Sequence, residues 1–260
     1  MPNPVNLVIQ DGVATITLAR SEAGNAMNWA LVDAFSAACE HTAADASVRS
    51  VLIEAEGKNF CVGGDLKAFA REGDPSDFIG RLARRLHLGV ALLASLPAPL
   101  IVAVQGAAAG AGLSLVASGD LVIAGRSSSY TMAYTAIGLV ADGGATWLLP
   151  RVIGLRRAQE MAYTNRRLSA EEAERYGLVT RLVDDEQVRY EARALAATIA
   201  KGPTFAFGQV KRLYAKSFAA NLPAQLDAEA VAIGEAMATQ DAKRAIAAFL
   251  NRQTPEFAGY

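Results

Sequence analysis

Residues 100–120, with the sequence LIVAVQGAAAGAGLSLVASGD, constrain the fold of this chain more than any other segment. They begin with the apolar run LIVAV, which lies between Pro99 and Gly106. A short apolar run between turn-forming residues is typical of a buried strand. Alanines and glycines follow, and the apolar residues 113–117 after them favour a helix. The segment therefore predicts a strand that passes through a glycine-rich turn into a helix.

The turn in this segment contains Gly106, Gly110 and Gly112. Glycine and alanine at a strand-to-helix junction let another group approach the backbone closely. The first N–H groups of a helix have no partner inside it, and they lie at the positive end of the helix dipole. We therefore expect a cradle for a negatively charged oxygen, although the same glycine spacing is also common where a helix packs tightly.

Two nucleotide-binding motifs are excluded by the residues around this turn. A phosphate-binding loop needs a following Gly-Lys-Ser/Thr, and none is present. A dinucleotide fingerprint needs Gly-x-Gly-x-x-Gly directly after a strand. Here Gly110-Ala111-Gly112 continues into an apolar segment without the third glycine, so a dinucleotide cofactor is not expected.

Size, charge and cysteine content further narrow the class of protein to which this chain can belong. The 260 residues suit one large domain or one domain with an appendage, and 52% of them are hydrophobic, enough for a sizeable core. The net charge of −1 gives no basic footprint for nucleic acid. No apolar run is long enough to cross a membrane, and the start MPNPVNLVIQ does not resemble a signal peptide. Cys39 and Cys61 do not suggest a disulfide framework, and we expect a cytoplasmic protein.

Strand and helix signals alternate through most of the chain. Asp11-Gly12 between two apolar runs predicts a hairpin, and Asn28 is a good N-cap for a helix that reaches about Cys39. Further strands are expected at residues 50–55, 121–124 and near 130–132, and a long helix around residues 82–93. This alternation favours an α/β fold of parallel βαβ units.

The last part of the chain is predicted to be helical. Strand signals stop after about Asp184, and helix-forming residues continue to Leu250 with breaks at Gly202-Pro203 and Leu222-Pro223. We therefore expect a core in residues 1–195 and a helical appendage in residues 196–260 that packs against other subunits.

Five sequence blocks, in this order, resemble those of the crotonase superfamily, also called the enoyl-CoA hydratase/isomerase family. They are RSEAGNAMN (20–28), NFCVGGDL (59–66), AVQGAAAGAGLSL (103–115), IGLVADGGATWLLPRVIG (137–154) and FLNRQTPEF (249–257). The fourth block resembles especially the ring 1,2-epoxyphenylacetyl-CoA isomerases. The resemblance implies a spiral of ββα units with a helical C-terminal trimerisation region, assembled as a homotrimer or a dimer of trimers.

The same resemblance implies acyl-CoA thioester substrates, with coenzyme A as part of the substrate. We expect no metal or redox cofactor, because the sequence has no metal-spaced His/Cys cluster and no dinucleotide fingerprint. By position, the backbone N–H groups of Gly64 and Ala111 would hold the thioester oxygen. A developing enolate needs hydrogen-bond donors of this kind, and the loss of one typically lowers the rate by a factor of about 10²–10³. The matching coenzyme A loops contain Ala23, Asn25, Ala26, Val62, Gly63, Asp65 and Leu66.

Three positions decide which reaction this pocket can perform. Hydratases of the family carry two glutamates where this chain has Ser114 and Tyr134. Ser114 is expected to fill a small helical position, and Tyr134 to line the acyl pocket as a poor base. Asp142 is where some isomerases and related enzymes carry a catalytic aspartate, although it can also act as a helix cap ahead of Gly143-Gly144. Ile137 and Trp147 hint at a roomy apolar or aromatic pocket.

His87 falls where a dehalogenase of the family has its histidine base, but its neighbours Arg84 and Arg85 favour a structural or solvent-facing role. The leading hypothesis is an acyl-CoA isomerase or related lyase that uses Asp142 for proton transfer. A hydratase with atypical catalytic residues and a non-catalytic acyl-CoA-binding protein are the alternatives.

Overall fold

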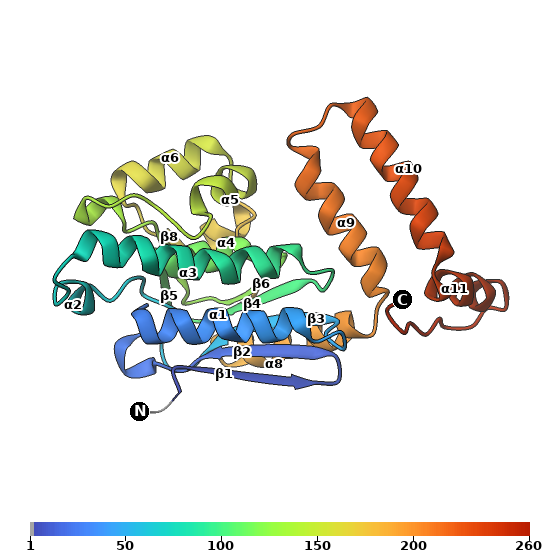
Figure 1. Cartoon of the computed structure of the whole chain (residues 1–260), viewed down its shortest axis with the longest axis horizontal. Helices are drawn as coiled ribbons and strands as arrows, with labels where there is room; N and C mark the ends of the chain where they lie inside the picture. Colours follow the sequence, from blue (N-terminus) through green and yellow to red (C-terminus); the bar gives the residue numbers. More distant parts are fainter. Residues whose placement is uncertain (1–2) are drawn as a thin grey trace.

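The computed structural model describes residues 3–260 (Figure 1). The chain starts with an antiparallel hairpin of β1 (Val5–Gln10) and β2 (Val13–Leu18). Asp11 and Gly12 connect the strands with φ angles of 51° and 78°. These positive angles match the tight turn that suits the twist of a hairpin and that Asp-Gly adopts readily. The predicted hairpin is thereby confirmed.

A six-stranded sheet forms the centre of the molecule in the order β1-β2-β3-β4-β6-β9. Its other strands are β3 (Ser50–Ala55), β4 (Leu100–Val104), β6 (Leu121–Gly125) and β9 (Arg181–Val183). From β2 onward the neighbours are parallel. Every residue of β3 and β4 is buried, because helices cover both faces of a parallel sheet. This explains the uninterrupted apolar sequence of β4 and the apolar run Val51–Ile53 of β3, whose buried Ser50 and Glu54 have hydrogen-bond partners in Ala196 and Arg193.

A smaller sheet lies beside the end of the main one and carries the glycine-rich turn. It consists of β5 (Ala107–Ala109), β7 (Ser129–Thr131) and β8 (Leu168–Ser169). Isolated bridges pair Cys61 with Ala108 and Met27 with Gly64. Three loops from distant parts of the sequence therefore meet at one edge.

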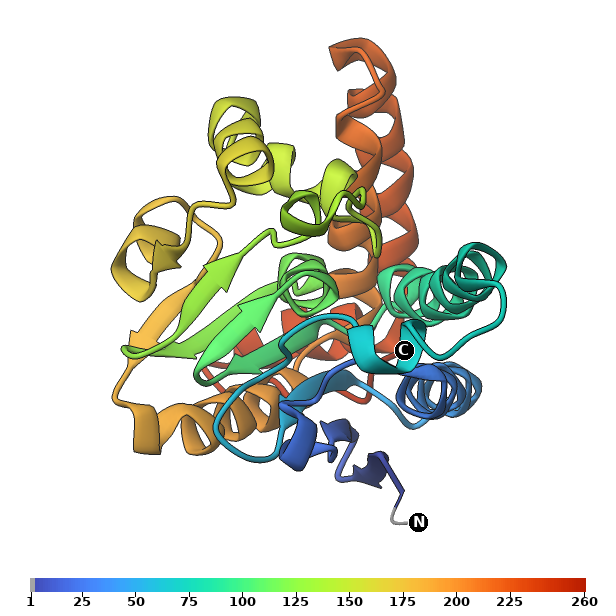
Figure 2. The ribbon, with the colours of Figure 1, turned by 90° about the vertical axis from the view of Figure 1, so that its left-hand side faces the viewer.

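Helices cover the two faces of the main sheet (Figure 2). On one side α1 (Trp29–Ala44) packs along α3 (Pro75–Ser95), and Asn28 caps α1 by accepting from the N–H of Leu31, as predicted. On the other face Ala192 and Ala196 of α8 (Val188–Ala200) pack against Ile101 of β4. The remaining short helices are α2 (Leu66–Phe69), α4 (Ala111–Ser118), α5 (Ala145–Val152), α6 (Leu155–Thr164) and α7 (Ala170–Arg175), with 3₁₀ turns at Ser21–Ala23, Thr135–Ile137 and Asp185–Gln187.

The C-terminal helices project away from this core (Figure 1). They are α9 (Thr204–Ser217), α10 (Leu222–Ala238) and α11 (Gln240–Leu250). The expected boundary at residue 195 falls inside α8, which belongs to the core because its last turn still packs on the sheet. The chain leaves the core at Gly202, as the predicted break there indicates. Pro223 does not interrupt a helix but occupies the first turn of α10, where its missing N–H costs nothing.

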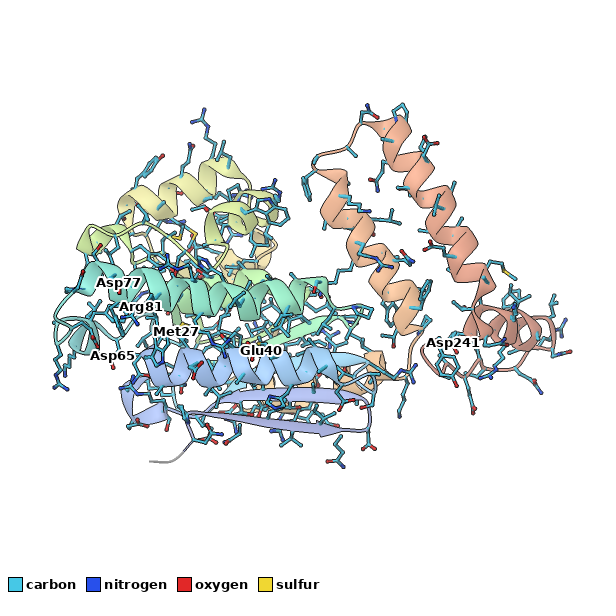
Figure 3. The ribbon with its side chains drawn as sticks, in the orientation of Figure 1. Met27, Glu40, Asp65, Asp77, Arg81 and Asp241 are labelled. Carbon is cyan, nitrogen blue, oxygen red and sulfur yellow. The ribbon has the colours of Figure 1, made fainter. Side chains whose placement is uncertain are left out.

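The C-terminal tail returns to the base of this projection (Figure 3). The buried carboxylate of Asp241 accepts hydrogen bonds from the N–H groups of Ala258 and Gly259, each at 2.7 Å. Arg49 donates to the carbonyl oxygens of Gly202 and Phe257. The tail thus ties α11 to the point where the projecting helices leave the core. Within residues 3–260, none of the helices has the length and apolar character needed to span a membrane.

Candidate active site

The two glycine-rich loops lie against each other through backbone hydrogen bonds. The N–H of Cys61 donates to Ala107 O at 3.2 Å, and the N–H of Ala109 donates to Cys61 O at 2.9 Å. Gly112 is required behind them, because a Cβ there would lie 2.3 Å from Cys61 O. The first turn of α4 can therefore approach the other loop only with glycine at this position.

Each loop turns sharply just before the residue predicted to donate its N–H. Gly63 has φ +98° and Gly110 has φ +52°, a region that side-chain-bearing residues seldom adopt. In the described part of the chain, the N–H groups of Gly64 and Ala111 have no hydrogen-bond acceptor. Both residues line the same cavity, and Ala111 is the first residue of α4. The geometry therefore suits the binding of one negatively charged oxygen by two backbone donors.

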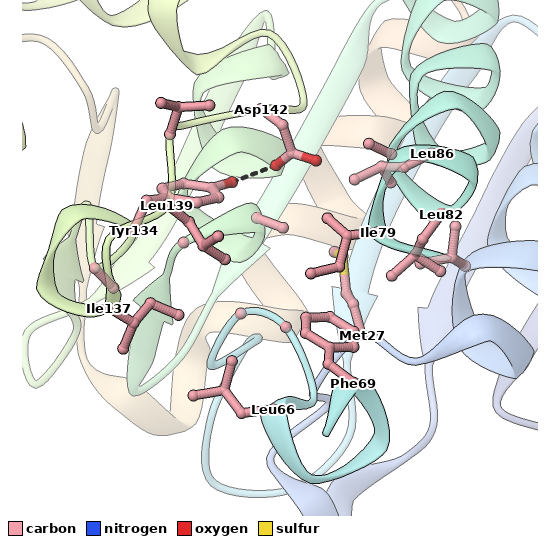
Figure 4. A pocket seen from close by; sticks show the side chains of 18 of the residues that line it. Met27, Leu66, Phe69, Ile79, Leu82, Leu86, Tyr134, Ile137, Leu139 and Asp142 are labelled. Carbon is pink, nitrogen blue, oxygen red and sulfur yellow. Dashed lines mark hydrogen bonds between the residues drawn. The ribbon is translucent and has the colours of Figure 1, made fainter. Parts of the chain in front are cut away.

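The cavity beside these loops has a volume of about 480 Å³ and is mainly apolar (Figure 4). Met27, Phe69, Ile79, Leu82, Leu86 and Leu139 contribute side chains to it. The apolar face of α3 forms one wall, and residues 133–142 form the opposite wall. Pockets of this size with few polar groups are typical of small-molecule sites.

Asp142 is the only acidic residue among the described residues that line this cavity. Its Oδ1 accepts a hydrogen bond from the hydroxyl of Tyr134 at 2.6 Å (Figure 4). The hydroxyl of Ser114 lies 3.1 Å from that of Tyr134 and donates to the backbone oxygen of Asp142 at 2.9 Å. The three predicted residues therefore form one hydrogen-bonded group, held together from α4 and from the loop before α5.

The turn that presents Asp142 depends on close packing against Ser114. Gly143 has φ +61°, and a Cβ on it would lie 2.9 Å from the Cβ of Ser114. The small side chain expected at position 114 is therefore required for packing, and its hydroxyl also makes the bonds described above. The helix-cap alternative for Asp142 is wrong, because Gly144 is the N-cap of α5 and no side chain of the described residues caps that helix.

Tyr134 acts here as a hydrogen-bond donor. Burial raises the pKa of its phenol far above the ordinary value, and the neighbouring charge of Asp142 raises it further. Tyr134 therefore keeps its proton and keeps donating it to Oδ1. Ala133, which precedes it, adopts φ 63°, an uncommon conformation for alanine that the sequence does not signal.

His87 lies closer to Asp142 than the sequence suggests. Its Nε2 accepts a hydrogen bond from the N–H of Gly143 at 3.1 Å and lies 3.8 Å from Oδ2 of Asp142. The imidazole is half-exposed, so one edge of the ring faces solvent, as expected. The other edge contacts the loop that carries the acid.

The two loops expected to bind coenzyme A are adjacent. The N–H of Val62 donates to Gly24 O at 3.1 Å, and the N–H of Met27 donates to Gly63 O at 2.7 Å. Val62, Gly63 and Leu66 line the cavity, whereas Ala23 and Ala26 lie on the neighbouring loop outside its lining.

Two polar residues of these loops serve mainly to hold them in shape. Asn25 is fully buried, and its side chain donates to Glu56 O and Asn59 O and accepts from the N–H of Arg20. Asp65 caps α2 and pairs with Arg20 at 2.7 Å. Burial alone would raise the pKa of Asp65, but the hydrogen bond from Ala68 and the Arg20 guanidinium outweigh it and keep the pKa below its usual value.

Trp147 does not line the cavity, contrary to the prediction. Its indole is half-exposed on α5, and the guanidinium of Arg151 lies 4.0 Å from the ring centroid. Ile137 does line the cavity. The cavity wall formed by Leu82 and Leu86 was not predicted, although the helical spacing of those residues marked an apolar face.

Comparisons with known proteins identify the family of this chain. The family model described as enoyl-CoA hydratase/isomerase matches residues 8–260. A probable enoyl-CoA hydratase from Rhodobacter capsulatus is 39% identical over 251 residues, which make up 96% of each chain. The 1,2-epoxyphenylacetyl-CoA isomerase of Escherichia coli is 37% identical over 255 residues, covering 96% of this chain and 97% of the relative.

Solved structures show the same fold. A Mycobacterium abscessus protein described under the same family name superposes with a TM-score of 0.95 and 35% identity, covering 98% of this chain and 100% of that chain. An enoyl-CoA hydratase from Mycobacterium smegmatis gives a TM-score of 0.90 and 31% identity, with 97% and 98% covered. The chain therefore has the crotonase fold, and it belongs to the enoyl-CoA hydratase/isomerase family. Its relatives are named after both reactions, so the reaction must be inferred from the residues of the site.

Proposed function

We propose that the protein is an acyl-CoA isomerase that moves a double bond by proton transfer through Asp142. The observation that carries this proposal is the hydrogen bonding of the two carboxylate oxygens of Asp142. Oδ1 is occupied by the Tyr134 hydroxyl, whereas Oδ2 has no hydrogen bond within residues 3–260 and belongs to a residue that lines the cavity. A carboxylate with one oxygen held and one free suits a positioned general base.

The reaction follows from this geometry. The thioester oxygen accepts from the N–H groups of Gly64 and Ala111, which stabilise the negative charge of the enolate. Oδ2 of Asp142 takes a proton from a carbon of the acyl chain, and the electron pair of that C–H bond moves into the conjugated enolate. Asp142 then returns the proton to another carbon of the same system, so the product has the composition of the substrate.

Hydration is less well supported by the residues present. Adding water to a double bond needs groups that activate and deliver the water, and the family's two glutamate positions hold Ser114 and Tyr134. The hydroxyl of Ser114 is used in holding Asp142, and Tyr134 keeps its proton. A hydratase with atypical residues and a non-catalytic acyl-CoA-binding protein are the alternatives that the experiment below distinguishes.

We also propose that the adjacent loops of residues 20–28 and 59–66 bind the coenzyme A part of the substrate, and that no metal or redox cofactor takes part. The groups that would perform the chemistry are the carboxylate of Asp142 and the backbone N–H groups of Gly64 and Ala111. Within residues 3–260 there is no group of three or more His, Cys, Asp or Glu side chains arranged to hold a metal ion. Activity that a chelator abolishes would contradict this part of the proposal.

The test uses the purified protein with a panel of acyl-CoA esters that includes 2-enoyl, 3-enoyl and aromatic-ring-derived esters, analysed by mass spectrometry and NMR. An isomerase yields a product of unchanged mass, whereas a hydratase yields one heavier by one water. Asp142→Asn keeps the size of the side chain and should lower turnover by roughly 10²–10⁴ while acyl-CoA affinity remains. Asp227→Asn, on the exposed face of α10, is the matched control. Near-wild-type turnover in Asp142→Asn would overturn the proposal.

A further inference from the structure

His87 and Asp142 present two hydrogen-bond acceptors to each other. The N–H of Gly143 donates to Nε2 of His87 at 3.1 Å, so Nε2 carries a lone pair there and Nδ1 carries the proton of the neutral ring. Oδ2 of Asp142, 3.8 Å from Nε2, is also an acceptor when the carboxyl group is ionised. In this state no proton is available to join the two atoms, which accounts for a separation longer than a hydrogen bond.

This arrangement changes as soon as Asp142 has taken up a proton. Oδ1 already accepts from Tyr134, whose raised pKa prevents it from giving up its own proton. The incoming proton therefore resides on Oδ2, the oxygen that lies nearest His87. An Oδ2–H group is a donor, Nε2 is the acceptor beside it, and a small rotation of either side chain closes the gap. Catalytic hydrogen bonds are often long in a free enzyme and tighten during the reaction.

We propose that His87 is a proton-transfer partner of Asp142 that connects the catalytic acid with solvent. The proposal rests on the isomerase function proposed above. Protonated Asp142 donates its Oδ2 proton to Nε2 of His87, which leaves a carboxylate and an imidazolium. The imidazolium then releases a proton to water, and the reverse steps bring a solvent proton back to Asp142. No electrons are transferred, and every proton is accounted for.

The position of His87 fits this role. The side chain of Asp142 is 28% exposed and that of His87 is 47% exposed, so the imidazole is the more accessible of the two. Leu86, the preceding residue of α3, lines the apolar cavity, whereas His87 is outside its lining. A proton on Asp142 thus has two routes, back to the acyl chain or outward through His87. The balance between them decides how much solvent hydrogen appears in the product.

The experiment measures that balance with a 3-hexenoyl-CoA substrate in D₂O. Turnover and the fraction of product molecules that carry carbon-bound deuterium are followed in wild type, His87→Gln and His41→Gln. Glutamine at position 87 keeps an oxygen that can accept from the N–H of Gly143 but cannot take up a proton. We expect its deuterium fraction to fall well below that of the wild type at equal conversion. His41, on the exposed surface of α1, is the chain's other histidine, and its variant should match the wild type.

An unchanged deuterium fraction in His87→Gln overturns this inference, because a residue that only holds the loop would alter turnover and not the fate of the proton. Asp142→Asn, measured alongside, separates this failure from that of the proposed function. If Asp142→Asn abolishes isomerisation while His87→Gln leaves the deuterium fraction unchanged, only the role of His87 fails. If Asp142→Asn isomerises at the wild-type rate, the proposed function itself fails.

Discussion

The hydroxyl of Tyr134 donates a 2.6 Å hydrogen bond to Oδ1 of Asp142 from within the same cavity wall. Because this phenol keeps its proton, the bond fixes the orientation of the carboxyl group and leaves Oδ2 3.8 Å from Nε2 of His87. Tyr134 is therefore a positioning residue for Asp142, and its ring is also part of the cavity lining.

Replacement of Tyr134 by phenylalanine should lower kcat while KM changes little. A hydrogen bond to a charged group is worth about 1.5–3 kcal/mol, which corresponds to roughly a 10- to 100-fold change in rate if it is lost in the transition state. Steady-state kinetics on the best acyl-CoA substrate measures the effect. Tyr163→Phe, which removes an exposed hydroxyl on α6, is the control. Equal kcat in Tyr134→Phe and wild type would show that Asp142 is oriented without this bond.

Hydration of crotonyl-CoA should be feeble compared with the best reaction of the protein. Neither Ser114 nor Tyr134 offers a carboxylate to activate water, and both hydroxyls belong to the group around Asp142. The loss of the crotonyl-CoA absorbance measures the rate directly. A turnover on the order of tens per second, typical of efficient enzymes, would show that other groups activate the water.

The contact between the two glycine-rich loops should tolerate no side chain at Gly112. A Cβ there would lie 2.3 Å from Cys61 O, so alanine would force α4 and the N–H of Ala111 away from the other loop. We expect Gly112→Ala to lose most acyl-CoA turnover and to lower the melting temperature.

Gly234 is the matched control for that variant. It lies in the interior of α10 with open space around its Cα, so alanine there should stabilise the helix by about 0.5–1 kcal/mol. Differential scanning fluorimetry and kinetics on both variants compare a glycine required by packing with one that is not. Wild-type activity in Gly112→Ala would mean that the loops can separate without losing the oxyanion donors.

The projecting helices should mediate self-association, which we propose to be a homotrimer or a dimer of trimers. Ile233 and Phe249 are 72% and 80% exposed, and Val231, Met237 and Ile246 are also exposed. Exposed apolar side chains concentrated on two consecutive helices are typical of an interaction site. Multi-angle light scattering at micromolar concentration should give a trimeric or hexameric mass. A monomeric mass would contradict the proposal.

Local chemistry made much of the fold predictable. Asp11-Gly12 encodes its own turn, and the apolar runs Val51–Ile53 of β3 and Leu100–Val104 of β4 mark buried strands whatever surrounds them. β5 was not predicted because its three residues are all alanine, which has little preference for strands. It forms because Cys61 and β7 supply hydrogen-bond partners on either side, and those partners are distant in sequence.

In the site, too, local sequence predicts some features, whereas others depend on residues that are distant in sequence. The motifs indicated Gly64, Ala111, Tyr134 and Asp142, and all four line one cavity. The proximity of His87 to Asp142 could not be derived from local sequence, because it depends on how α3 packs beside the loop before α5. Trp147 was misplaced for a related reason. Its helix directs the indole toward Arg151, one turn along, and away from the cavity.

The anchoring of the C-terminal tail leads to a final prediction, on Asp241. Its two carboxylate oxygens each accept one backbone N–H, from Ala258 and from Gly259, and the residue is 2% exposed. Asparagine has the same shape but only one acceptor oxygen, so one of the two N–H groups would face an amide NH₂ and lose its partner.

A buried donor left without a partner costs about 1–3 kcal/mol, and each kcal/mol lowers the melting temperature of a chain of this size by roughly 2–4 °C. Asp241→Asn should therefore melt several degrees below wild type, and protease should cleave its tail faster, because the tail no longer holds α11 at the base of the projection. Asp227→Asn, an exposed change on α10, should leave both measurements unchanged. If Asp241→Asn melts and is cleaved like the wild type, these hydrogen bonds do not anchor the tail, and the contacts of Arg49 must suffice.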